Sequence, residues 1–166
     1  ENDDGEINVV PASALCFKND GRVEDCDVEA IVLGDWACGG IASNNNGVME
    51  DCRFAGTVES GRWFAEDEGE ERWAVVNTNT GGICRSNSGL VQNCRNEGTI
   101  LSGTITDTRH MHYNCGGIVG SIGEGGSVEN CENLGCVESP QICGGIAGIS
   151  RGEIRGCSNA EEIHVK

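Results

Sequence analysis

Five copies of one pattern of apolar and polar positions run through this chain. Each copy has an aliphatic residue after a pair of small residues, then a turn, a cysteine and a β-branched residue. The aliphatic positions are Leu15, Ile41, Ile83, Ile118 and Ile146. The cysteines that follow them are Cys26, Cys52, Cys94, Cys131 and Cys157, and the β-branched residues are Val32, Val58, Ile100, Val137 and Ile163. A repeat of this kind indicates a stacked architecture rather than a globular core.

Within each copy, short apolar runs alternate with turn residues. In the second copy, Val48, Glu50 and Cys52 alternate along one run, and Asn45-Asn46-Gly47 precedes it as a turn. Alternation predicts a strand with one buried face, and Asn and Gly tolerate the backbone of sharp turns. No run shows helical spacing. The pattern therefore predicts an all-β fold, a parallel β-solenoid of about five coils whose equivalent residues stack about 4.8 Å apart.

The terminal copies deviate as capping repeats do. We expect an N-terminal strand or cap segment in residues 1–14, with a separate strand over 6–10, and the solenoid over residues 15–166. Two inserts, residues 59–80 and 101–114, interrupt the repeats. The chain begins without Met, which favours a processed product or a piece of a longer protein.

Composition and charge narrow the range of partners. The formal net charge of −16 argues against nucleic acid and anionic membranes, whose binding relies on Lys and Arg. No apolar stretch approaches the roughly 20 residues of a membrane span. The pair Gly39-Gly40 and its equivalents precede strands, which is typical of turns and not of a nucleotide site. We expect no cofactor.

Two segments carry the repeat most completely: CGGIVGSIGEGGSVENCENLGCV and GGICRSNSGLVQNCRNEGTI. Their pattern resembles the GLUG motif, close to GG-[LIV]-[VA]-G-x-N-x-G-x-[IV]-x-N-C-x-N-x-G-x-[IV]. The resemblance covers all five copies and leaves the N-terminal segment and both inserts outside. It implies a secreted or surface-attached bacterial protein whose β-helical repeats form a stalk or adhesin-like module. It implies no catalytic residues.

The eleven cysteines follow the repeat. Each copy has one cysteine after its second strand and one earlier, either before the Gly pair or just after the aliphatic residue. This either/or placement suggests disulfides within each copy, with Cys136 left over; the pairs are Cys16/Cys26, Cys38/Cys52, Cys84/Cys94, Cys115/Cys131 and Cys143/Cys157. The alternative is that they are buried free thiols, which pack as small apolar residues.

The first insert joins Trp63, Phe64 and Trp73 to the acidic block Glu66-Asp67-Glu68-Gly69-Glu70-Glu71. We interpret it as a hairpin. Its aromatic residues either stack on a glycan or a partner, or cover a face of the solenoid, which we favour. The carboxylates are possible Ca²⁺ ligands, but no calcium-loop spacing is present and a solvated charge run is the better interpretation.

The second insert contains His110 and His112, near Cys115. A metal site is conceivable there, but a surface loop is favoured, and no Ser/His/Asp grouping accompanies it. We expect a protein that is not an enzyme, and that is extracellular or attached to the cell surface. The leading hypothesis is a structural or adhesive module that associates with copies of itself or with other domains along the solenoid axis. The alternative is a carbohydrate-binding or carbohydrate-active β-helix protein.

Overall fold

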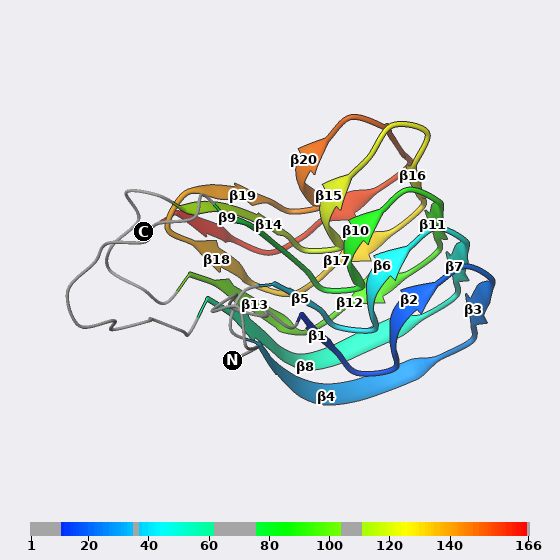
Figure 1. The fold of residues 1–166 in the computed structure, drawn as a ribbon, viewed down its shortest axis with the longest axis horizontal. Helices are drawn as coiled ribbons and strands as arrows, with labels where there is room; N and C mark the ends of the chain where they lie inside the picture. Colours follow the sequence, from blue (N-terminus) through cyan, green and yellow to red (C-terminus); the bar gives the residue numbers. More distant parts are fainter. Residues whose placement is uncertain (1–10, 35–36, 62–75, 104–110, 166) are drawn as a thin grey trace, which may run out of the picture.

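The computed structural model describes residues 11–34, 37–61, 76–103 and 111–165, which form a parallel β-solenoid of five coils (Figure 1). Each coil adds a rung to each of four parallel sheets, here named A to D in chain order. No helix occurs in these ranges. The predicted fold class is therefore confirmed. Within the same ranges, no helix of sufficient length and apolarity to cross a membrane is present.

The coils follow one another in sequence. They comprise β1–β4, β5–β8, β9–β13, β14–β18 and β19–β23, and are called the first to the fifth coil. Sheet A contains β1 (Ala12–Ser13), β5 (Cys38–Gly39), β9 (Val76–Gly81), β14 (Met111–Gly116) and β19 (Ile142–Gly144). Sheet B contains β2 (Cys16–Asn19), β6 (Ala42–Asn45), β10 (Cys84–Asn87), β15 (Val119–Ile122) and β20 (Ala147–Ser150).

The remaining strands close each coil. Sheet C contains β3 (Arg22–Glu24), β7 (Val48–Glu50), β11 (Leu90–Gln92), β16 (Ser127–Glu129) and β21 (Glu153–Arg155). Sheet D contains two long strands, β4 (Asp27–Gly34) and β8 (Arg53–Ser60). In each of the third, fourth and fifth coils, two short strands take the place of the long strand. These pairs are β12 (Arg95–Asn96) and β13 (Thr99–Ser102), β17 (Glu132–Asn133) and β18 (Val137–Ser139), and β22 (Ser158–Asn159) and β23 (Ile163–Val165).

The apolar core is a set of stacked equivalent residues. The strand register places Val58, Ile100 and Val137 in successive coils, and all three are fully buried. Ile41, Ile83 and Ile118 are likewise inaccessible, as the repeat predicts. At the two ends the expectation fails: Leu15 is 52% exposed and Ile146 is only partly buried. Nothing among the described residues stacks on the outer side of an end coil.

The Gly pair of the repeat has a packing reason. In each of the middle coils, a Cβ atom on the second glycine would collide with the side chain that sheet D presents across the coil. Gly82 meets Asn96 in this way and Gly117 meets Asn133. A Cβ there would also lie 2.0–2.2 Å from the carbonyl oxygen of the second glycine in the next coil, so only glycine allows both the stacking of the coils and the close approach of sheet D.

Two asparagine ladders run along the axis. In the first, Asn19 donates to Asn45 and Asn45 donates to Asn87, each amide bond being 2.8 Å long. In the second, Asn96 donates to Asn133 and Asn133 donates to Asn159, both at 2.7 Å. The same amides also bond to backbone groups at the adjoining turns. These ladders satisfy buried polar groups that would otherwise be costly.

The described strands revise the insert boundaries. Residues 76–80 and 111–114 belong to β9 and β14, which pair over six residues. The solenoid strands that follow each insert therefore begin earlier than expected. Before both segments the chain turns at a glycine of positive φ, Gly61 (76°) and Gly103 (71°). Gly103 N–H donates to the Ser60 carbonyl at 3.0 Å. The described strands of the second and third coils therefore end at the same corner.

The first coil begins at Ala12 rather than Leu15. The expected strand over 6–10 lies outside the described residues.

Replacing Asn133 by Leu is expected to lower the free energy of unfolding by about 2 kcal/mol or more. The change keeps the number and branching of the side-chain heavy atoms but leaves the Asn96 amide, the Asn159 oxygen and the Gly135 N–H without their partner, and each such loss costs about 1–3 kcal/mol. Urea denaturation followed by circular dichroism measures this loss. Asn46→Ala is the matched control, since this exposed amide bonds only to exposed Asp20. Equal effects of the two changes would contradict a stabilising role of the ladder.

Candidate functional site

The stacked cysteines Cys26, Cys52, Cys94, Cys131 and Cys157 form a cysteine ladder at the corner between sheets C and D. Each thiol donates to the carbonyl oxygen two residues before it, at 3.1–3.3 Å. The Cys94 and Cys131 backbone N–H groups each donate to the sulfur of the next coil's cysteine at 3.4 Å. The thiols therefore act as hydrogen-bonding groups that complete the corner.

The residue before each ladder cysteine makes this corner possible. Asp25, Asp51, Asn93 and Asn130 all have φ between 50° and 53°, and Gly156 has φ of 62°. Asp, Asn and Gly are the residues that adopt this left-handed conformation most readily. The corner turns the carbonyl group two residues before the cysteine toward the thiol. This role was not predicted from the sequence, although the repeated Asp-Cys and Asn-Cys pairs indicate it.

The expected disulfides are not formed, and all eleven cysteines carry reduced thiols. This corrects the pairing of Cys16 with Cys26, Cys38 with Cys52, Cys84 with Cys94, Cys115 with Cys131 and Cys143 with Cys157. The physical reason is the stacking. Equivalent cysteines align between coils, as Cys115 and Cys143 do in sheet A, while the ladder thiols bond to corner carbonyls. The buried free-thiol interpretation describes the structure.

Burial and neighbouring sulfurs raise the pKa of several of these thiols. The hydrogen bond with Cys131, together with burial, raises the pKa of Cys94 to about 12 from its ordinary 9.0. Hydrogen bonding with Cys94 and then burial raise the pKa of Cys52. Burial is the main cause that raises the pKa of Cys84 and of Cys115. Because the thiolate is the reactive form, these cysteines are poor nucleophiles.

A charged network crosses the outer surface of sheet D. Arg53 bonds to Asp27 at 2.6 Å and to Glu97 at 2.6 Å, and Arg95 bonds to Glu97 at 2.8 Å. The Arg53 guanidinium lowers the pKa of Glu97. The pairs are solvent-exposed, so each contributes little to stability. Their arrangement links three successive coils across the surface.

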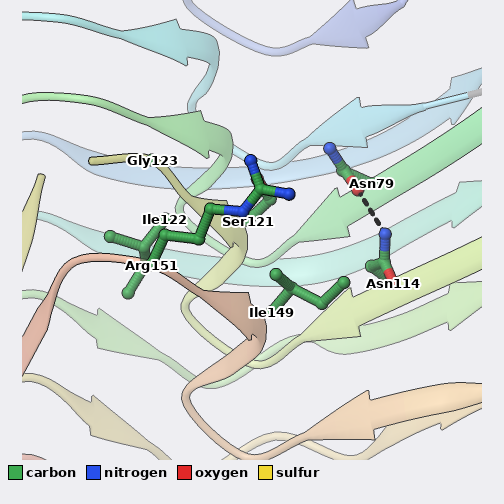
Figure 2. Close-up of a pocket in the computed structure, with 7 residues that line it drawn as sticks. All are labelled: Asn79, Asn114, Ser121, Ile122, Gly123, Ile149 and Arg151. Atoms are coloured by element: carbon green, nitrogen blue, oxygen red, sulfur yellow. Dashed lines mark hydrogen bonds between the residues drawn. The ribbon is translucent and has the colours of Figure 1, made fainter.

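An open groove of about 280 Å³ lies between sheets A and B over the last three coils (Figure 2). Asn114 donates to the Asn79 oxygen at 2.8 Å, while its own buried oxygen Oδ1 has no hydrogen-bond partner. Ile149 and the guanidinium of Arg151 complete the wall shown in Figure 2. These groups suit a small polar ligand. Of the groove residues, only Arg151 carries a charge.

The sequence-predicted site residues are not brought together in the described ranges. Trp63, Phe64, Trp73, the acidic block 66–71 and His110 lie outside them, so the covering role that we favour for the aromatic residues stays a prediction, and glycan contact and Ca²⁺ binding stay the alternatives. His112 lies in β14, where it pairs with Asn77. Among the described residues, no group of three or more His, Cys, Asp or Glu side chains is arranged to hold a metal ion.

The large apolar side chains left exposed belong to the end coils. In the first coil they are Leu15, Phe17, Ile31 and Leu33, and in the fifth Ile142, Ile149, Ile154 and Val165. The three middle coils add none among the described residues.

Comparison of the chain with family models, with curated proteins and with solved structures gave no match. The function is therefore inferred from the chain's own ladders and ends.

Alkylation of the native chain without reductant is expected to label the buried cysteines slowly, because their thiols are inaccessible and burial raises the pKa of Cys84, Cys94 and Cys115. Unfolding in denaturant, still without reductant, should expose eleven reactive thiols. Mass spectrometry counts the labels. A parallel sample treated with reductant is the control. Fewer than eleven labels without reductant, rising to eleven with it, would restore the disulfide hypothesis.

Stability is also expected to fall at alkaline pH. The folded state raises the pKa of Cys94 from 9.0 to about 12, so it favours the protonated thiol. This contribution is fully present below pH 9 and is lost as pH rises toward 12. Urea midpoints measured across this interval test it. Cys94→Ala should reduce the slope; an unchanged slope would exclude Cys94 as its source.

Proposed function

We propose that this chain is an extracellular structural module, a rigid β-solenoid segment that serves as a stalk, an adhesin module or a fibre subunit. The observation that carries the proposal is the continuity of its ladders. Each of the four parallel sheets extends through all five coils, and equivalent residues pair from one coil to the next. A stack of this kind transmits force along its axis through many backbone hydrogen bonds.

The polar ladders support a mechanical role. Asn19, Asn45 and Asn87 join the first three coils through side-chain bonds parallel to the axis, and Asn96, Asn133 and Asn159 join the last three. The two series overlap in the third coil. Stretching the solenoid along its axis therefore opposes side-chain bonds as well as backbone bonds in every coil.

The surface charge suits an extracellular location, and the most deeply buried thiols are protected from oxidation there. The net charge of −16 favours solubility, and the resemblance to GLUG repeats implies a secreted or surface-attached bacterial protein. Free thiols persist in an oxidising medium when they are buried and protonated, because oxidation proceeds through the exposed thiolate. The raised pKa of Cys84 and of Cys115 provides this protection.

Immunogold labelling of cells that produce the protein tests the proposal. Antibodies against the chain should label intact cells at their surface, on projections or on shed material. Permeabilised cells give the total signal and serve as the control. Labelling confined to the interior after permeabilisation would overturn the extracellular structural role. This outcome does not depend on whether the purified chain self-associates.

A further inference from the structure

The first and fifth coils are equal in length, position for position. The first runs from Ala12 to Gly34 and the fifth from Cys143 to Val165, as the strand register assigns them. The offset is constant, since 143 − 12 = 131 and 165 − 34 = 131. The fourth coil, by contrast, has two extra residues in the turn at 123–126. A first coil can therefore stack on a fifth coil without insertion or deletion.

This superposition brings opposite charges together on one face. With the offset of 131, Arg22 lies over Glu153 and Glu24 lies over Arg155, in strands β3 and β21. The preceding turn places Asp20 over Arg151. The Arg22–Glu24 and Glu153–Arg155 side chains are more than half exposed. Every charged position of these two strands thus meets its opposite in the stacked copy.

The same charges exclude the neighbouring registers. A slip of one residue would turn the inward side chains outward. A slip of two residues in one direction places Asp20 over Glu153 and Arg22 over Arg155. A slip of two in the other direction places Arg22 over Arg151 and Glu24 over Glu153. Both slips juxtapose like charges, so only the unshifted register is electrostatically favourable.

Apolar and backbone groups at the two ends complement the charges. Stacking in this register covers Leu15 with Ile146, and Val23 with Ile154, which is 43% exposed. Within the chain, Ile118 N–H donates to the Ile146 carbonyl at 3.0 Å. The corresponding bond at the junction runs from Ile146 N–H to the Leu15 carbonyl. Among the described residues, the strands of both end coils are sheet edges, which are surfaces suited to strand addition.

We propose that a second copy of this chain docks by its first coil on the fifth coil of its neighbour, in register, with Asp20–Arg151, Arg22–Glu153 and Glu24–Arg155 as the pairs that set the register. The contact is head-to-tail, so it does not close on itself and generates a filament. Each copy advances the filament by about 24 Å, five coils at about 4.8 Å each. The proposal deepens the structural function above and rests on it.

Two charge swaps, each without change of net charge, test the contact in the full chain. One is Arg22→Glu with Glu24→Arg in the first coil, which keeps a cation next to Glu50. The other is Glu153→Arg with Arg155→Glu in the fifth coil. Each swap alone puts like charges at two of the three pairs. In sedimentation velocity at low salt, each should weaken association at least about fivefold relative to the unmodified chain.

Mixing the two swapped chains should restore association, because each swapped end then meets its complement and the copies alternate. The control swap, Arg95→Glu with Glu132→Arg on the side of the solenoid, should leave association unchanged. Circular dichroism verifies that each variant is folded. Association that resists both swaps, or that mixing does not restore, would overturn the proposed contact and indicate another occupant of the ends.

Electron microscopy of the unmodified chain provides a test that needs no variant. Filaments with an axial repeat of about 24 Å and uninterrupted spacing of about 4.8 Å are expected. A chain that stays monomeric at high concentration in low salt would show that the head-to-tail contact does not form. The proposed structural role would then be tested by the immunogold result alone.

Discussion

The in-register hydrogen bonding of parallel coils is the constraint on which the rest of this structure depends. Once one coil stacks on the next, every side chain lies directly above its equivalent, at the spacing of neighbouring strands. Apolar positions must then repeat, as Val58, Ile100 and Val137 do. A buried polar position must also repeat, because its best available partner is the same residue in the adjacent coil. The asparagine ladders are the direct result.

The sharp corner between sheets C and D illustrates how local and stacked interactions support each other. A left-handed residue before the cysteine turns the chain, and the thiol then accepts or donates hydrogen bonds with the backbone of the corner. A disulfide would remove the thiol hydrogen from this arrangement. Cysteine is suited to the position because it is small, apolar enough for the interior and still able to donate weakly.

The same constraint leaves the ends incomplete. Middle coils have a neighbour on each side and hide their aliphatic residues, whereas end coils have one neighbour in the described structure and expose them. The charges of the first coil are complementary to those of the fifth coil, so they match when the first coil of one copy meets the fifth coil of another. The features that make the middle of the solenoid stable therefore also define how its ends can be covered.

The sequence by itself determined the coil, its strands and the buried aliphatic positions of the middle coils. It could do so because each coil repeats one local pattern, and stacking only multiplies that pattern. The state of the cysteines was decided by the tertiary structure, since Cys16 and Cys26 or Cys84 and Cys94 share a copy of the repeat without sharing a bond. The start of the first coil at Ala12 and the assignment of β9 and β14 to sheet A likewise depend on pairing between coils. The charge match between Arg22 and Glu153 became visible only with the register, because residues far apart in sequence become equivalent through three-dimensional stacking alone.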